Sequence, residues 1–151
     1  MTTPVQYMTT PVQYMTTPVQ YETDERMIRS LTEAECMCLL AGESVGRIVY
    51  TDGVLPTAFP VNYRLLNRRI VFRTKPTARV LMGSPDFRVS FEIDRSDEQT
   101  RTGWSVLVTG RCRPFHPDIA EADLDTWAST HRSSVQGISI DVISGRRLEA
   151  Q

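Results

Sequence analysis

Neither sign of charge is in surplus in the 151-residue sequence, because 17 basic side chains are matched by 18 acidic ones and the formal net charge is −1. A balanced charge gives no electrostatic reason to bind nucleic acid or an anionic membrane. No stretch approaches the ~20 apolar residues of a membrane-spanning helix, and no basic-then-apolar start suggests a secretory signal. We therefore expect a protein of the cytoplasm with neither nucleic acid nor membrane as partner.

Motifs for metal binding and for nucleophilic catalysis are also scarce. The three cysteines form no CxxC pair, and the two histidines, His116 and His131, have no serine or cysteine nucleophile at motif spacing. We interpret all three cysteines as packing residues, since free cysteine is usually buried. The sequence predicts no catalytic side chain and no metal site.

A threefold repeat opens the chain, because residues 1–21 are three identical copies of MTTPVQY. Each copy carries a proline, which costs a helix interior about 3 kcal/mol and so excludes a heptad coiled coil. We expect residues 1–24 to form a disordered tail and residues 25–151 to form one domain. The tail is either an interaction arm, whose recurring Val and Tyr could add to a sheet edge, or a short coding duplication.

The remaining sequence has the pattern of a mainly β protein with a few helices. A helix is expected over Leu31–Ala41, begun by a capping box of Ser30 and Glu33 and stopped by Gly42. Strands are predicted over 45–51, 55–66, 69–74, 87–94, 103–115 and 137–143, and short helices over 76–83 and 117–129. Closure removes the exposed edges that otherwise aggregate, so six mostly antiparallel strands favour a barrel.

Turn, proline and glycine positions refine this prediction. The Asp52-Gly53 and Asn67-Arg68 pairs mark tight turns between strands. Pro56 and Pro60 lack an N–H donor, so we expect them at a sheet edge or a bulge. Gly110 is expected at a bulge or at a close approach of two backbones.

One basic cluster has the features of a phosphate site. The segment FRTKPTAR places Arg73, Thr74, Lys75 and Arg79 at a strand end and in the first turn of a predicted helix. Free backbone N–H groups and the helix dipole favour an anion there, and arginine adds bidentate phosphate recognition. The alternative is a basic helix start on a solvated surface.

A tryptophan between small residues is the second candidate. Gly103 and Ser105 flank Trp104 at the start of the longest predicted strand. Small neighbours can leave an aromatic face open for contact with a planar ring. The alternative is that Trp104 anchors the core, as most large aromatic side chains do.

The order of these motifs resembles a known family. LTEAECMCLLAGESVGRIVYTDGVLPTAFPVNY, then IVFRT, VSFEID and RTGWSVLVTGR, is similar to the pyridoxamine 5′-phosphate oxidase-like superfamily of FMN-binding split barrels. The nearest branches are the small actinobacterial-type proteins and the nitroimidazole-resistance proteins. The resemblance covers about residues 29–115, and GISIDVISGRRL fits the closing strand of the family.

The resemblance implies a homodimer of six-stranded antiparallel split β-barrels, with two flavin sites across the interface. Its cofactor contacts fall on one strand at Pro60, Val61 and Asn62, on the next at Phe72, Arg73 and Thr74, and near the flavin ring at Trp104 and Ser105. The family's phosphate-binding basic residue, commonly lysine, falls at Arg79. The basic cluster found from the residues alone, Lys75 included, thus coincides with the phosphate site that the family implies.

The implied function is that of an FMN-dependent oxidoreductase, which passes electrons from a nicotinamide donor to a small planar or nitroaromatic acceptor. A non-catalytic flavin-binding or storage protein and a deazaflavin-dependent reductase of the same fold are the alternatives. Arg73 stands where the nitroimidazole-resistance branch has histidine. SGRRL is at most a remnant of the substrate signature of true pyridoxamine phosphate oxidases, so vitamin B6 oxidation is not assigned.

Replacing Arg79 by alanine should weaken FMN binding by about 1.5–3 kcal/mol, the scale of one hydrogen bond to a charged group. Fluorescence titration of the purified variant with FMN measures the change. An unaltered dissociation constant would remove Arg79 from the phosphate site.

Overall fold

A computed structural model of the protein describes residues 28–52, 54–74, 87–116 and 134–149. These residues form one helix and eight strands. In chain order they are β1 (Ile28–Ser30), α1 (Glu33–Gly42), β2 (Val45–Asp52), β3 (Leu55–Leu66), β4 (Arg69–Thr74), β5 (Arg88–Asp97), β6 (Thr102–Pro114), β7 (Ser134–Ser139) and β8 (Val142–Leu148). The MTTPVQY repeats and the two short helices predicted over 76–83 and 117–129 lie outside the described residues.

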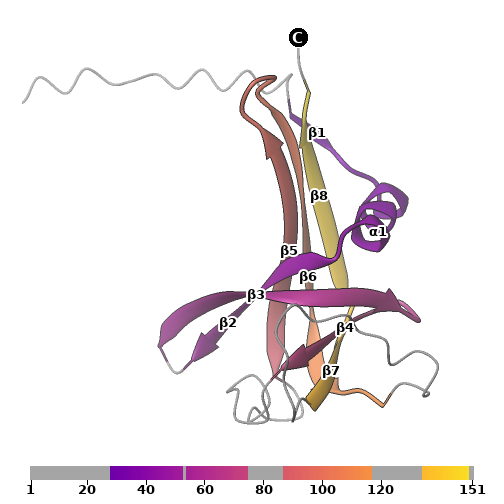
Figure 1. Ribbon diagram of the computed structural model, residues 1–151, viewed down its shortest axis with the longest axis vertical. Helices are drawn as coiled ribbons and strands as arrows, with labels where there is room; N and C mark the ends of the chain where they lie inside the picture. The colour runs from indigo at the N-terminus through magenta and orange to yellow at the C-terminus, as the bar shows by residue number, and fades with distance from the viewer. Residues whose placement is uncertain (1–27, 53, 75–86, 117–133, 150–151) are drawn as a thin grey trace, which may run out of the picture.

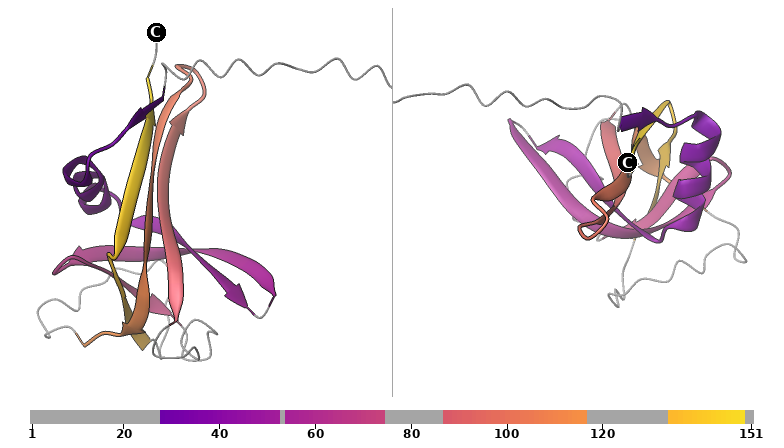
Figure 2. Two further views of the ribbon diagram at one scale, coloured as in Figure 1. Left: turned by 180° about the vertical axis from the view of Figure 1, so that it is seen from behind. Right: turned by 90° about the horizontal axis from the view of Figure 1, so that it is seen from above.

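Six of the strands close into a barrel. Neighbouring strands follow the order β6-β5-β2-β3-β4-β7, and β7 pairs back with the end of β6, where Cys112 lies opposite Ile138. Every pairing among the described strands is antiparallel. Seen from above in Figure 2, the sheet curls around a central axis. The predicted fold class, a mainly β antiparallel split barrel, is confirmed.

Two strands extend the sheet beyond this ring. β8 pairs with β6 over Gly103–Thr109, and β1 pairs with β8. Figure 1 shows β5, β6 and β8 running together along the long axis, while β2 and β3 cross it. The total of eight strands therefore exceeds the six that the sequence predicts, although the ring itself contains six.

The single strand predicted over residues 137–143 is wrong. The chain turns at Ile140 and Asp141, so that β7 and β8 are separate strands, and the Arg146-Arg147 pair predicted to follow the last strand lies inside β8. The backbone N–H of Asp141 donates to the carbonyl of Thr109 at 3.1 Å, which holds the turn against β6.

Gly110 lies where β6 changes partner. Residues 103–109 of β6 pair with β8, and residues 112–114 pair with β7 along the same edge. A Cβ at position 110 would overlap the backbone carbonyl of Ser139. The close backbone approach predicted for this glycine is therefore confirmed, and its cause is the crossing from β7 to β8.

Helix α1 begins one residue after Thr32, with a different cap from the predicted one. Glu35 Oε2 accepts the backbone N–H of Thr32 at 2.8 Å, and Thr32 Oγ1 accepts the backbone N–H of Glu35 at 3.3 Å. The first of these bonds is the main reason that the pKa of Glu35 falls from 4.5 to about 2. Ser30, the predicted cap, lies in β1 opposite Arg146. Two overlapping Ser/Thr-x-x-Glu patterns are present, Ser30 to Glu33 and Thr32 to Glu35. Because Ser30 is paired in β1, the second pattern forms the capping box.

The core fills the barrel and continues under α1. Its fully buried side chains come from the helix and from five strands of the ring, and they include Leu40, Ile48, Phe72, Phe91, Val106 and Ile138. Tyr63 OH donates to the carbonyl of Leu40 at 2.7 Å and ties β3 to the end of α1. Cys36 and Cys112 are buried, and burial raises the pKa of the Cys112 thiol to about 12. Cys38 is exposed, so the interpretation of all three cysteines as packing residues is wrong at that position.

The predicted Asn67-Arg68 turn and the predicted edge are confirmed, whereas Gly53 of the other predicted turn lies outside the described residues. Asn67 and Arg68 have φ of 49° and 56°, the left-handed values that a two-residue hairpin turn needs. Pro56 and Pro60 lie in the part of β3 that, among the described strands, pairs with β2 alone. Along its other edge this part of β3 pairs with no described strand, so the missing N–H groups of Pro56 and Pro60 break no strand hydrogen bond there.

Replacing Gly110 by alanine should lower the free energy of unfolding by about 3 kcal/mol or more, because the new methyl group meets rigid backbone. Gly42 is the matched control, since nothing lies within 4 Å of a Cβ built there. Its replacement by alanine should change stability by no more than about 1 kcal/mol. Chemical denaturation of both variants measures the difference, and equal stabilities would contradict the account of the β6 crossing.

Candidate functional site

The structure brings two of the predicted cofactor segments together. Tyr63 of β3 lies opposite Phe72 of β4, so Asn62 and Arg73 occupy the next positions on these neighbouring strands. Asn62, Arg73 and Thr74 are half-buried. Phe72 has no exposed area in the single chain, backbone included. Lys75 and Arg79 lie outside the described residues.

Pro60 and Val61 precede Asn62 on β3 and face opposite sides of the strand. Val61 is half-buried and packs against the core, whereas Pro60 is exposed. Pro60 pairs with Arg47 and Val61 with Gly46 on β2. This half of the predicted site, residues 60–62 with 72–74, is therefore a continuous strip over two strands at one end of the barrel.

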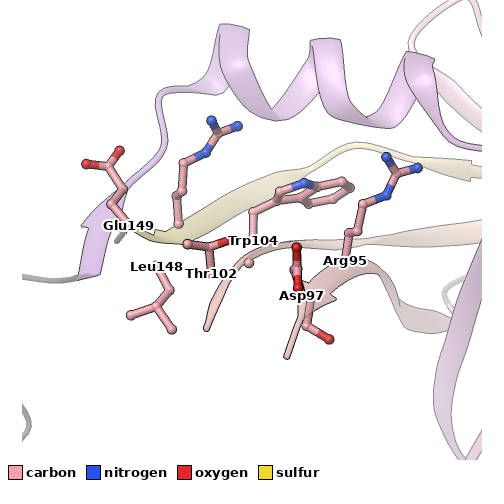
Figure 3. A pocket seen from close by; sticks show the side chains of 9 residues that line it. Arg95, Asp97, Thr102, Trp104, Leu148 and Glu149 are labelled. Atoms are coloured by element: carbon pink, nitrogen blue, oxygen red, sulfur yellow. The ribbon is translucent and has the colours of Figure 1, made fainter. Parts of the chain in front are cut away.

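Trp104 lies in a separate pocket of about 370 Å³. In the strand register it stands between Arg95 of β5 and Arg147 of β8, and all three residues line the pocket. The pocket is completed by Ser96, Asp97, Thr102, Gly103, Leu148 and Glu149. Figure 3 shows the indole ring of Trp104 on the side of the sheet that carries α1, with the Arg95 side chain beside it.

The surroundings of Trp104 fit both interpretations of this residue. The side chain is half-buried and packs against the core, as an anchoring residue would. It also lines an open pocket, as a ring-binding residue would. Ser105 does not line this pocket, because side chains alternate along a strand and Ser105 faces the opposite side of β6.

The two arginines beside Trp104 differ in how they are held. Arg95 Nη2 forms an ion pair with Glu43 Oε1 at 2.8 Å, just past the end of α1. Arg147 Nε is buried and makes no hydrogen bond to the described residues. A buried guanidinium nitrogen without a partner is costly, so Arg147 is held in the pocket wall at some expense of stability. The pocket thus offers an aromatic face and cationic donors to a planar, electron-rich or anionic group.

Neither arginine was singled out by sequence reasoning. Their role beside Trp104 follows from the register of β5, β6 and β8, which the sequence does not display. Arg147 in particular was predicted to follow the last strand, because the turn between β7 and β8 contains neither glycine nor proline.

Part of the predicted strip, Arg73 and Thr74, lies far along the sheet from the Trp104 pocket. Arg73 pairs with Val135, and the backbone of Phe115 donates to Val135 at 3.0 Å, so Arg73 lies level with Phe115. Phe115 is 11 residues beyond Trp104 in sequence. At ~3.3 Å per residue, a straight strand would place Phe115 and Trp104 at most about 36 Å apart. Pro60 lies closer to the pocket, because its partner Arg47 on β2 also pairs with Glu92 of β5, three residues before Arg95. Arg73 and Thr74 are thus the part of the strip that lies farthest along the sheet from Trp104.

Fold and pocket together define an antiparallel barrel with a pocket lined by an indole and two arginines, and comparison identifies its family. A family model described as pyridoxamine 5′-phosphate oxidase matches residues 32–147, so the chain belongs to that family. The resemblance seen in the sequence motifs is confirmed. In the described part of the chain, no helix has the length and apolar character needed to cross a membrane.

Three relatives illustrate the match. "Uncharacterized protein Rv0080" of Mycobacterium tuberculosis is 34% identical over 134 residues, which are 83% of this chain and 88% of that protein. The structure of a FAD binding protein from Mycobacterium smegmatis is 28% identical, with a TM-score of 0.64 over 81% of this chain and 99% of the other. A conserved protein of unknown function from Corynebacterium diphtheriae is 30% identical, with a TM-score of 0.64 over 82% and 99%.

Replacing Arg147 by methionine should leave the melting temperature of the ligand-free protein unchanged or raised, because it removes a buried nitrogen that lacks a partner. The same change should weaken FMN binding by about tenfold, the loss of one charge-assisted hydrogen bond.

The control is Arg146→Met, at the exposed neighbouring position on the opposite face of β8. Differential scanning fluorimetry and FMN titration measure both properties. Equal FMN affinities for the two variants would exclude Arg147 from the cofactor site.

Proposed function

We propose that the protein is an FMN-dependent oxidoreductase that accepts electrons from a nicotinamide donor and passes them to a small planar acceptor. The observation that carries the proposal is the pocket in which Trp104 stands between Arg95 and Arg147, in a chain of this family. A relative described as a FAD binding protein supports a flavin, and it makes FAD the second candidate cofactor.

The residues of the pocket fit a flavin ring. An indole face suits contact with a planar heteroaromatic system, and guanidinium groups suit its carbonyl-bearing edge. A bound flavin would supply the electron-transfer chemistry, which is consistent with a sequence that predicts no nucleophile. The protein's own residues would then bind the ring and place positive charge where negative charge develops during reduction.

The separation of the two halves supports a homodimer. The strip reaches from Pro60, which β2 links to Glu92 of β5, to Arg73 and Thr74, which lie level with Phe115 at the end of β6 away from Trp104. A ligand whose ring contacts Trp104 and whose phosphate contacts Arg73 and Thr74 would therefore draw on a second chain. In a dimer with twofold symmetry, the pocket of each chain meets the strip of its partner, which gives two equivalent sites. We therefore propose that the ring lies beside Trp104 of one chain while the phosphate lies near Arg73 and Thr74 of the other.

The spectrum and turnover of the purified protein test this function. We expect flavin absorption bands, bleaching by a reduced nicotinamide under anaerobic conditions, and recovery of the bands on adding a nitroaromatic or quinone acceptor. Chromatography of the released cofactor distinguishes FMN from FAD. A flavin that no nicotinamide reduces would indicate a binding or storage protein, and a colourless protein that binds only a deazaflavin would overturn the FMN assignment.

Mixed dimers test the shared site. Trp104→Leu alone and Arg73→Ala alone should each lose most of the bound flavin. Co-expression of the two variants should restore flavin to about a quarter of the wild-type content, because about half of randomly paired dimers are mixed and each has one intact site.

The matched control combines Trp104→Leu with Arg147→Met. Both substitutions lie in the same half of the site, so their co-expression should restore nothing. Absorbance per protomer, with light scattering to confirm the dimer, measures the outcome. Recovery in both mixtures, or in neither, would contradict a site built from two chains.

A further inference from the structure

A second pocket, of about 330 Å³, is lined by residues from β4, β6, β7 and the turn after β7. Figure 1 shows β4 and β7 side by side at the lower end of β6. Its lining is polar throughout and consists of Arg69, Arg111, Arg113, Ser139 and Asp141. It has no aromatic or aliphatic wall, unlike the pocket of Trp104 and Leu148. The chemistry of this pocket therefore favours a compact charged group over a ring.

Three neighbouring strands bring the arginines together. Arg69 begins β4 opposite Ser139 of β7, and Arg113 of β6 lies opposite Gly137 of β7. Because strand β7 separates β4 from β6, the arginine backbones stand about 10 Å apart across it. The short Ser139 side chain lies between the long arginine side chains, which leaves room for a ligand.

The hydroxyl of Ser139 is held in position by the backbone. Ser139 Oγ accepts the N–H of Arg111 at 2.9 Å. That bond uses an acceptor lone pair, so the hydroxyl still carries its own O–H donor. A hydroxyl donor in a fixed position beside guanidinium groups is a suitable arrangement for binding phosphate oxygens.

The local charge is strongly positive in a chain whose net charge is −1. Three arginines and one aspartate line the pocket, so its formal charge is 3 − 1 = +2. Asp141 also lies 3.5 Å from Arg88 Nη1, so a fourth arginine shares this carboxylate. A phosphate or diphosphate group is an anion whose oxygens match this arginine-rich lining.

This pocket is distinct from the predicted flavin phosphate site. Arg69 and Arg73 lie at opposite ends of β4, four residues apart, which corresponds to about 13 Å along a strand. The pocket also lies outside the strip of residues 60–62 and 72–74.

We propose that the pocket of Arg69, Arg111 and Arg113 is a second ligand site, which binds the phosphate or diphosphate group of a small molecule. The site lies beyond the proposed flavin site and does not depend on flavin binding. A small phosphorylated ligand is favoured over nucleic acid, because the pocket is compact and the chain as a whole carries no excess of positive charge.

Isothermal titration of the flavin-loaded protein with pyrophosphate tests the proposal. We expect saturable binding that weakens by about tenfold or more in Arg69→Gln and in Arg113→Gln, as the loss of a charge-assisted contact predicts. Asp141→Asn should strengthen binding, because it removes the carboxylate of the pocket. Arg64→Gln is the matched control: it removes one exposed charge from the neighbouring strand β3 without touching the pocket, and binding should be unchanged.

The outcomes separate this site from the flavin site. Absence of saturable binding, equal affinity in Arg69→Gln and Arg113→Gln, or displacement of the flavin by pyrophosphate would overturn the proposal. Flavin absorbance is followed in the same samples, and the variants should retain it. A protein purified without flavin would contradict the proposed function, while the titration would still test the second site.

Discussion

The crossing of the chain at Gly110 is the constraint on which the rest of the structure depends. The carbonyl of Ser139 occupies the space that a side chain at position 110 would need, so β7 can reach the end of β6 and close the barrel. Immediately afterwards β8 pairs with the other part of the same edge. One strand, β6, therefore carries both the closure of the ring and the extension of the sheet.

Both pockets are consequences of this arrangement. Above the crossing, β8 brings Arg147 beside Trp104 and forms the pocket that suits a planar ring. Below it, β7 brings Ser139 between Arg69 and Arg111 and forms the pocket that suits a compact anion. The same length of β6 holds the Trp104 pocket away from Arg73, which is why the proposed flavin site needs two chains.

Much of the fold follows from local sequence signals. The bounds of β3 and β4 agree with prediction because turn residues separate them and alternating side chains fill them. The split between β7 and β8 was missed because GISIDVISGRRL alternates through the Ile140-Asp141 turn without a glycine or proline to mark it. Pairing over long sequence distances, which local patterns do not encode, decides where such a segment bends.

The sequence indicates some of the residues of the candidate site, but it does not indicate which of them lie next to one another. Trp104 was recognisable from its small neighbours, whereas Arg95 and Arg147 become partners of Trp104 only through the strand register. The strip of β3 and β4 was predicted as one unit, and the register confirms that its segments are neighbours. No local pattern indicates that Arg73 and Thr74 lie level with Phe115, at the end of β6 away from Trp104.

A crystal structure of the flavin-loaded protein tests the central claim most directly. The account predicts a dimer in which the ring contacts the Trp104 indole of one chain, within about 4 Å. It places the phosphate beside Arg73 and Thr74 of the other chain. A flavin bound wholly within one chain, or bound away from Trp104, would contradict it.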